Sequence, residues 1–400
     1  MTHQFRNKSE EFVYQTARES FLSLWSYANP LGKHPGRELC DVLVVCDPAI
    51  IIFSVKEISV SKKDVDSVYL ERWSRKAIES SCKQIYGAER YLTSAENVTK
   101  SDGTDGVRLP DKDARRVYRI AVALGGEGKT LIHSGDFGKG FVHVFDKISF
   151  ATVLSELDTL SDFIVYLEAK ESFCKSSDMV MVGGGEEDLL AFYLYNERTF
   201  PKTTNQLILV EEGIWEKFIN EKQYLAKHKE DKISYVWDSL IEYLSKNSFP
   251  YLELGSSLSD IELGLRVMAK ENRFSRRLLG KVFSDFLANK TKVRSRVFSS
   301  LGNVTYVFLA APFSQTREQR VFELENRCYV ARNIFPKNNT AVGIATESDA
   351  PIKGFSLDMI YFRQDEWTKY DRKKAKRLSK EFGLFAKPLM DRISDEEYPI

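Results

Sequence analysis

Residues 36–57 of the chain read GRELCDVLVVCDPAIIIFSVKE, and this stretch determines how the N-terminal part folds. Two apolar, β-branched runs, 39–45 and 50–55, are separated by a short polar connection. Such runs are typical of two buried strands joined in a hairpin-like way. Asp41 lies at the start of the first run, and Lys56 follows the second. The stretch therefore predicts two central strands, each with a charged residue where its burial should begin or end.

A helix is predicted on each side of this pair of strands. Residues 9–28 carry apolar side chains at helical spacing, and the Asn-Pro pair that follows ends the pattern. Residues 68–93 have the pattern of a second, longer amphipathic helix. Glu19 lies on the first predicted helix and Gln84 on the second. The order helix, strand, strand, helix is typical of an α/β domain.

The arrangement of Glu19, Asp41 and Ser54-Val55-Lys56 resembles the PD-(D/E)XK nuclease superfamily, especially its restriction-endonuclease-like and Holliday-junction-resolvase-like members. In that superfamily a helix glutamate, a strand aspartate and an acid-X-lysine motif on the next strand surround one or two metal ions. The resemblance covers the first quarter of the chain.

The resemblance implies a role for each matching residue. Glu19, Asp41 and the carbonyl group of Val55 would bind Mg²⁺ or Mn²⁺, and Lys56 would lie beside the attacking water. Gln84 lies where exonuclease-like members also place a glutamine. The implied activity is metal-dependent hydrolysis of DNA phosphodiester bonds, as in bacterial restriction and antiphage-defence nucleases. Many members pair up to cut both strands, so the resemblance also implies a homodimer.

Ser54 departs from the superfamily pattern, because the usual residue at its position is Asp or Glu. Strand alternation puts Ser54 and Lys56 on one face and Glu57 on the other, so Glu57 does not replace the missing acid. A hydroxyl is a neutral ligand, and the site loses one negative charge. Either the remaining oxygens and water suffice for one metal ion, or the site is degenerate and the fold only binds nucleic acid or protein.

Basic residues near the two strands are candidates for contacts with phosphate groups. Those on the second helix follow helical spacing and would form one stripe along it. Acidic residues on the same helix favour an alternative, in which the stripe is a solvated, ion-paired face. The candidates are Lys33, Arg37, Arg72, Lys76, Lys83 and Arg90.

The fold class expected for the whole chain is α/β, in three regions. A nuclease-like domain with a restriction-endonuclease-like mixed sheet is expected over 1–175, a mainly helical region over 176–300, and a small α/β region over 301–400. In the last region, predicted strands at 303–311 and 340–346 flank a helix. A third alternative places catalysis in this C-terminal region, although no Gly-x-Ser-x-Gly motif supports a serine hydrolase there.

Composition limits the other classes of function. The 58 Lys and Arg residues nearly balance the 57 Asp and Glu residues, so a nucleic-acid role must rest on local patches. The five cysteines form no CxxC pair, which indicates reduced thiols and a cytoplasmic protein. No apolar run approaches the ~20 residues of a membrane span, so we expect no membrane association.

Residues 123–130, ALGGEGKT, match a relaxed phosphate-loop pattern. A phosphate loop requires a helix directly after its lysine, so that backbone amides at the helix N-terminus bind the phosphates. The glycine-rich sequence that follows is not helical in pattern. We therefore predict a hairpin turn here and expect no nucleotide cofactor.

Overall fold

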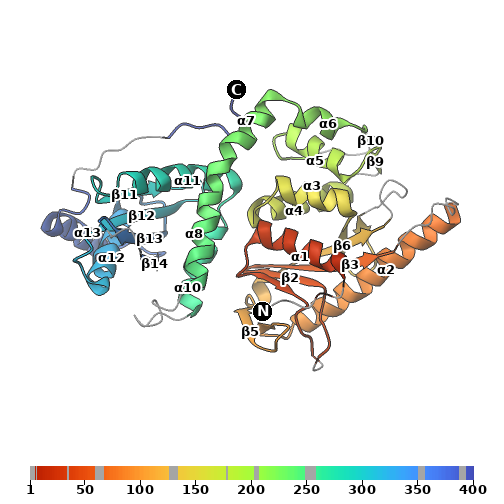
Figure 1. The fold of residues 1–400 in the computed structure, drawn as a ribbon, viewed down its shortest axis with the longest axis horizontal. Coiled ribbons are helices and arrows are strands. Elements are labelled where there is room, and N and C mark those ends of the chain that lie inside the picture. The colour runs from red at the N-terminus through yellow and green to blue at the C-terminus, as the bar shows by residue number, and fades with distance from the viewer. Residues whose placement is uncertain are drawn as a thin grey trace. The chain divides into compact units, whose positions relative to one another are not determined.

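The computed structural model describes residues 5, 7–33, 36–58, 67–125, 134–176, 179–201, 207–247, 258–349, 356–386 and 393–400. The contacts within the chain divide it into two compact units, residues 1–224 and 225–400 (Figure 1). Each unit contains a mixed sheet with helices packed against it, which confirms the α/β class. The boundaries expected near residues 175 and 300 fall inside the first and the second unit, respectively.

The first unit is built on a six-stranded sheet in the order β1-β2-β3-β6-β8-β7. The central hairpin is as predicted, because β2 (Val42–Cys46) and β3 (Ala49–Glu57) pair antiparallel. β3 then pairs parallel with β6, and β6 with β8. The remaining strands of this sheet are β1 (Ser26–Ala28), β6 (Arg116–Leu124), β7 (Gly135–Asp136) and β8 (Phe141–Phe145).

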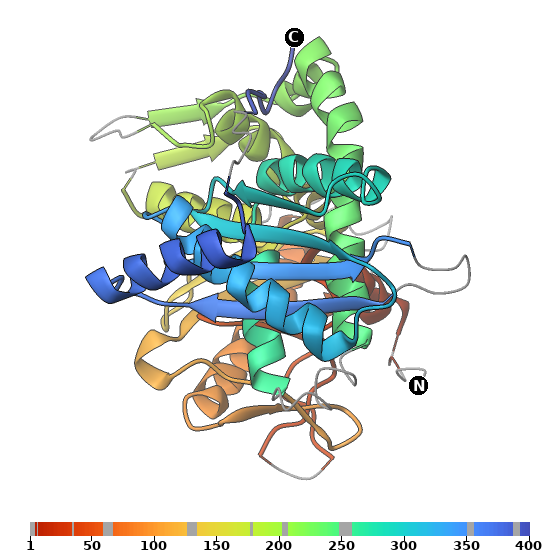
Figure 2. The ribbon, with the colours of Figure 1, turned by 90° about the vertical axis from the view of Figure 1, so that its left-hand side faces the viewer.

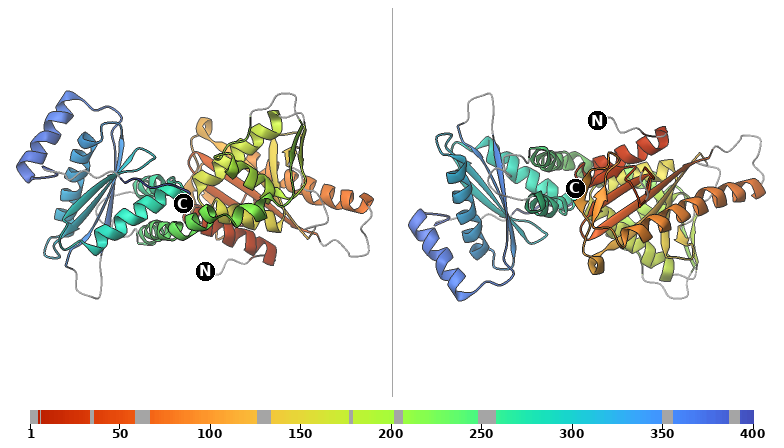
Figure 3. Two further views of the ribbon diagram at one scale, coloured as in Figure 1. Left: turned by 90° about the horizontal axis from the view of Figure 1, so that it is seen from above. Right: turned by 90° about the horizontal axis from the view of Figure 1, so that it is seen from below.

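Helices cover both faces of this sheet (Figures 1 and 3). One face packs on α2 (Ser67–Leu92), whose Ile78 and Ile85 share a core with Ile50 and Ile52 of β3. The opposite face packs on α1, α3 and α4, with aromatic rings from β3, β8 and α3 in contact. These helices span Lys8–Phe21 (α1), Lys147–Glu156 (α3) and Leu160–Ser176 (α4).

The first helix is shorter than predicted, and the expectation of helix over residues 22–28 is wrong. α1 ends at Phe21 because Leu22 has a φ of 71°, in the left-handed region that interrupts a right-handed helix. Ser26 to Ala28 instead form β1, which pairs antiparallel with Val42–Val44 of β2. Backbone hydrogen bonds to the sheet therefore override the helical spacing of the apolar side chains.

Residues 176–300 are mainly helical, as expected, but they also contain strands that the sequence pattern does not reveal. β9 and β10 form a separate parallel pair in the first unit. The elements of the first unit not yet named are β4 (Asn97–Thr99), β5 (Asp105–Arg108), η1 (Lys112–Ala114), β9 (Met179–Val182), α5 (Glu186–Tyr195), β10 (Leu207–Val210) and α6 (Ile214–Ile219). Helix α7 (Lys222–Asp231) begins at the end of this unit.

The second unit contains a four-stranded sheet in the order β11-β12-β13-β14 (Figure 2). The predicted strand-helix-strand order is confirmed, because β12 and β13 are parallel and α12 connects them. Helix α12 covers one face of the sheet, with α13 packed against α12, and α8, α10 and α11 cover the other face (Figure 3). The bounds are η2 (Lys232–Ser234), α8 (Tyr235–Lys246), α10 (Leu258–Ala269), α11 (Arg273–Ala288), β11 (Ser295–Ser299), β12 (Val304–Ala311), α12 (Arg317–Ile334), β13 (Thr340–Glu347), β14 (Leu357–Arg363) and α13 (Lys369–Phe382).

Two sequence-based expectations can be compared with the structure only over the described residues. β6 ends at Leu124, and residues 126–133 of the phosphate-loop-like segment lie outside those residues, so the predicted turn stays a prediction. Over the part of the chain that is described, no helix combines the length and the apolar character needed to cross a membrane.

Candidate functional site

The carboxylate of Asp41 lies at the start of β2, buried against the end of β3. Its side chain is only 4% exposed. Oδ2 accepts a hydrogen bond from the backbone N–H of Val55 at 2.5 Å, and Oδ1 accepts one from the Gln84 amide at 3.2 Å. The position follows from the hairpin register, in which Val42 pairs with Phe53, so that Asp41 is one residue further along, beside Ser54. The carboxylate thus has fixed partners on a strand and on a helix.

Ser54 and Lys56 lie on the face of β3 that is turned toward α2, as strand alternation predicts. The Ser54 hydroxyl donates to Oε1 of Gln84 at 2.8 Å, and the Lys56 ammonium group donates to the same oxygen at 2.8 Å. Lys56 Nζ also donates to the carbonyl oxygen of Val55 at 3.2 Å and lies 3.8 Å from Oδ2 of Asp41. Glu57 lies on the opposite face, where it accepts a hydrogen bond from Ser9.

Gln84 is the residue that connects these groups. It lies on α2, next to the apolar stripe that packs on the sheet, and its amide has both an acceptor and donors to offer. Oε1 accepts from Ser54 and Lys56, while the Nε2 group donates to Asp41. The structure therefore brings four of the five predicted catalytic residues into one hydrogen-bonded cluster, which we call the Asp41 cluster: Asp41, Ser54, Lys56 and Gln84.

The oxygen atoms of the Asp41 cluster are suitable ligands for a hard divalent cation. They come from one carboxylate, the Val55 carbonyl, the Ser54 hydroxyl and the Gln84 amide. Among the described residues, no group of three or more His, Cys, Asp or Glu side chains is arranged so that it could hold a metal ion, and the Asp41 cluster contributes one carboxylate. Magnesium is commonly held by one or two carboxylates, with water and substrate phosphate completing its coordination. The donor set thus fits a site with a single carboxylate from Asp41 and neutral oxygens around it.

Glu19, the predicted helix ligand, is exposed near the C-terminal end of α1. A different glutamate of the same helix, Glu10, is only 5% exposed. Ser9 donates to Glu57 at 2.6 Å, so the residue before Glu10 contacts the residue after Lys56. The two glutamates are nine positions apart, which corresponds to about 14 Å along the helix axis. Glu10 therefore lies at the end of α1 that meets the end of β3, and Glu19 lies at the other end.

Glu10 is a candidate that the sequence analysis missed, although the sequence carries a signal for it. Glu10 shares the helical spacing i, i+3, i+4, i+7 with Val13, Tyr14 and Ala17, which are all buried. A charged residue on the apolar face of an amphipathic helix is unusual and must be paired or hydrogen-bonded. The Asn7 side chain, which caps the helix, donates to Glu10 Oε1 at 3.1 Å.

The basic candidates for phosphate contacts lie on the surface of the first unit. Lys76, Lys83 and Arg90 are exposed on α2, and Lys33 and Arg37 are exposed in the loop before β2. Arg72 is on α2, but its side chain lies outside the described residues. Glu89 is one of the acidic residues of α2 that could pair with this stripe, but it binds Arg119 of β6 through both carboxylate oxygens. One of the acids that would neutralise the α2 stripe is therefore committed elsewhere.

The thiols next to the Asp41 cluster are unsuited to nucleophilic chemistry. Burial, and then the neighbouring carboxylates of Asp41 and Glu38, raise the pKa of the Cys40 thiol well above its usual range. Burial, and then Glu79, raise the pKa of Cys82 to about 11. Both thiols are therefore protonated at neutral pH, whereas the thiolate is the reactive form.

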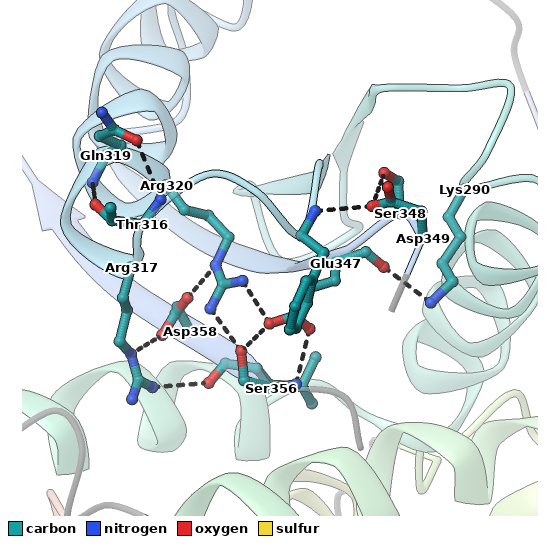
Figure 4. Close-up of polar contacts among 12 residues, drawn as sticks. Lys290, Thr316, Arg317, Gln319, Arg320, Glu347, Ser348, Asp349, Ser356 and Asp358 are labelled. Carbon is teal, nitrogen blue, oxygen red and sulfur yellow. Dashed lines mark hydrogen bonds and ion pairs between the residues drawn. The ribbon is translucent and has the colours of Figure 1, made fainter. Parts of the chain in front are cut away.

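A second buried polar cluster lies in the other unit, where α12 begins and β13 ends (Figure 4). Arg320 donates to Glu347 at 2.6 Å and to Ser356 at 2.5 Å, and it also pairs with Asp358. Arg317 binds the other oxygen of Asp358 at 2.5 Å. Among the residues that the structure describes, the partners of the Ser356 hydroxyl are thus Glu347 and an arginine, and no imidazole is among them. This arrangement joins α12, β13 and β14 and is typical of a structural network.

Comparisons with known proteins add no assignment to either cluster: the chain matches no family model, no curated protein and no solved structure.

Replacement of Asp41 tests its structural role apart from any chemistry. Asp41→Ala leaves the buried N–H of Val55 without its acceptor, so we expect a loss of about 1–3 kcal/mol in the free energy of unfolding. Asp41→Asn keeps an acceptor oxygen of the same shape and should lose less. Urea denaturation measures both, and the exposed Asp105→Ala should change stability by less than about 0.5 kcal/mol. Equal stability of Asp41→Ala and wild type would show that the carboxylate does not hold the strand ends together.

Proposed function

We propose that the first unit is a metal-dependent nuclease that hydrolyses phosphodiester bonds of DNA. The observation that carries the proposal is the Asp41 cluster, in which one carboxylate, one ammonium group, one hydroxyl and one amide meet at the ends of two apolar strands. The order of the main sheet supports it as well, since α1, β1, β2, β3, α2 and β6 give helix, three antiparallel strands, helix and a parallel strand, with the separate β4–β5 pair and η1 inserted before β6. The resemblance to the PD-(D/E)XK nuclease superfamily rests on the same residues.

In this proposal Asp41 and the Val55 carbonyl hold Mg²⁺ or Mn²⁺, with the Ser54 hydroxyl as a neutral neighbour. A bound divalent cation supplies positive charge to stabilise the negative charge that develops on the phosphate in the transition state. The N–H of Val55 fixes the Asp41 carboxylate in one orientation, because it occupies one side of Oδ2. The protein thereby offers a pre-oriented ligand, which lowers the cost of reorganisation on binding.

Lys56 is the charged member of the Asp41 cluster that reaches solvent, with 30% of its side chain exposed, whereas Asp41 is buried. An ammonium group has three N–H donors, and those of Lys56 reach Gln84 and Val55 within the cluster. A remaining donor can orient a water molecule or bind a phosphate oxygen. Gln84 holds the lysine in place, since it accepts from both Lys56 and Ser54.

A second candidate function is binding without hydrolysis, and the state of Ser54 favours it. Ser54 is fully buried, and its hydroxyl already donates to Gln84, so the position that usually supplies an acid supplies no charge. Without that charge the cluster attracts a divalent cation less strongly. In this alternative the fold recognises nucleic acid or a protein and leaves it intact.

The proposed setting is a bacterial restriction or antiphage-defence system in the cytoplasm. All five cysteines are free, which fits a reducing compartment. A homodimer that cuts both strands of DNA belongs to the same proposal.

Cleavage of plasmid and linear DNA in the presence of Mg²⁺ or Mn²⁺ tests the proposed activity. Lys56→Ala should lower the cleavage rate by about a hundredfold or more, because it removes the donor for the water or the phosphate. Asp41→Asn should abolish cleavage, because it removes the only carboxylate of the cluster. Lys112→Ala, which changes an exposed lysine of the same unit, should cut like wild type. If wild type binds DNA but cuts none with either metal, the binding function is correct and the nuclease proposal fails.

A paired test of the two glutamates of α1 identifies the helix carboxylate. Glu10→Gln should slow cleavage by about tenfold or more, because Glu10 lies at the end of α1 where Ser9 contacts Glu57, the residue after Lys56. Glu19→Gln should change the rate by less than about twofold, since that side chain is exposed at the other end of the helix. Initial rates on linear DNA decide the matter. The reverse result would support the assignment to Glu19 that the sequence pattern predicts.

A further inference from the structure

Helix α13 carries a strong excess of positive charge, although the charges of the whole chain nearly balance. Residues 369–382 contain seven Lys and Arg residues and two acids, while the whole chain has a formal net charge of only +1. Six of these cations are exposed, and we call them the α13 basic face: Lys369, Arg372, Lys373, Lys376, Arg377 and Lys380.

The opposite side of α13 is anchored within the second unit. Asp371, Ala375 and Leu378 are buried, and Leu378 packs with Val330 of α12 and with Leu384. The Tyr329 hydroxyl donates to Asp371 at 2.6 Å. Thr368 and Asp371 form a reciprocal capping box at the helix start. One of the two acids is thus used for anchoring, and the cations are held outward on a fixed helix.

The cations of the α13 basic face repel one another. Four pairs have the spacing i, i+4, which places like charges next to each other on a helix: 369 and 373, 372 and 376, 373 and 377, and 376 and 380. Among the described residues, the one ion pair of this face joins Arg377 to Glu381 at 3.8 Å. The like charges of this face repel one another, and a polyanion bound along it would offset that repulsion.

We propose that the α13 basic face binds the phosphate backbone of duplex DNA. The choice of DNA as the partner rests on the proposed nuclease function, which this surface extends by holding the substrate on the chain that cuts it. The helix is about 21 Å long, and duplex DNA carries one negative charge per about 1.7 Å of its axis, so several phosphates lie within reach of its cations. Such contacts carry little sequence information and hold DNA of any sequence.

A lipid surface fits this helix less well. Amphipathic helices that bind membranes insert their apolar face between the lipid headgroups. The apolar residues in the middle of α13 are covered, because Ala375 is fully buried and Leu378 packs against Val330 and Leu384. Its two exposed aromatic residues, Tyr370 and Phe382, lie at opposite ends of the helix. A soluble polyanion needs only the charged face and requires no exposed apolar surface.

Binding of a fluorescein-labelled 20-base-pair duplex to the full chain, followed by fluorescence anisotropy in EDTA, tests the proposal without cleavage. The variant Arg372→Gln/Lys376→Gln/Lys380→Gln removes three exposed cations from one row of the face. The matched control Lys229→Gln/Lys232→Gln/Lys292→Gln removes three exposed lysines from elsewhere in the same unit. We expect the α13 variant to raise the dissociation constant by about tenfold and to flatten the log–log salt dependence by about three, and the control to change both much less.

The outcomes separate this proposal from the nuclease proposal. Equal weakening in both triple variants would show that only net charge matters, and unchanged binding in the α13 variant would show that DNA binds elsewhere; either result overturns the proposal. So would binding to phosphatidylserine vesicles that depends on the α13 basic face, without binding to the duplex. Thermal unfolding at the wild-type temperature confirms that the variant is folded. If the protein binds the duplex through α13 but does not cut DNA, the proposed nuclease function is contradicted and the proposed role of α13 in DNA binding stands.

Discussion

The contact on which the Asp41 cluster depends is the hydrogen bond from the Val55 N–H to the Asp41 carboxylate. A carboxylate at the head of an apolar strand is costly to bury unless it is hydrogen-bonded, and this N–H, together with the Gln84 amide, meets that requirement. Val55 in turn lies between Ser54 and Lys56, so the same contact fixes both side chains on the face of β3 turned toward α2. Each group of the cluster has its orientation set by another, which gives a rigid site with one exposed cation.

Much of the fold could be predicted from the sequence, because the β2–β3 hairpin and α2 are defined by local patterns. The runs around Val42 and Ile50 are apolar on both faces, as in strands covered by helices, and α2 has a continuous apolar stripe. The end of α1 at Phe21 was not predictable in this way, since Tyr27 and Ala28 of β1 fit either a helix or a strand. That choice is made by pairing with β2, a contact between residues distant in sequence. β9 and β10 were missed for the same reason, because they are short and pair only with each other.

Asp41, Ser54 and Lys56 could be predicted as site residues, because polar or charged side chains stand out within or beside apolar strands and strand alternation shows which of them share a face. Gln84 was reachable only through the resemblance, since a glutamine on a long polar helix has no pattern of its own. The helix glutamate shows the limit of spacing arguments. Glu10 and Glu19 are on the same helix, and only the packing of α1, with Ser9 against Glu57, distinguishes the end that lies beside β3. Burial favours Glu10, a preference that the order of residues alone does not give.

The central claim is that a single buried carboxylate, with neutral oxygens around it, suffices to bind one divalent cation. Titration of the full chain with Mn²⁺, followed by the electron paramagnetic resonance signal of the free ion, measures this binding directly. The account predicts one bound Mn²⁺ per chain in wild type and none at that site in Asp41→Asn, with binding retained in Lys112→Ala. Absence of bound Mn²⁺ in wild type, or equal binding in Asp41→Asn, would contradict the claim that the Asp41 cluster is a metal site.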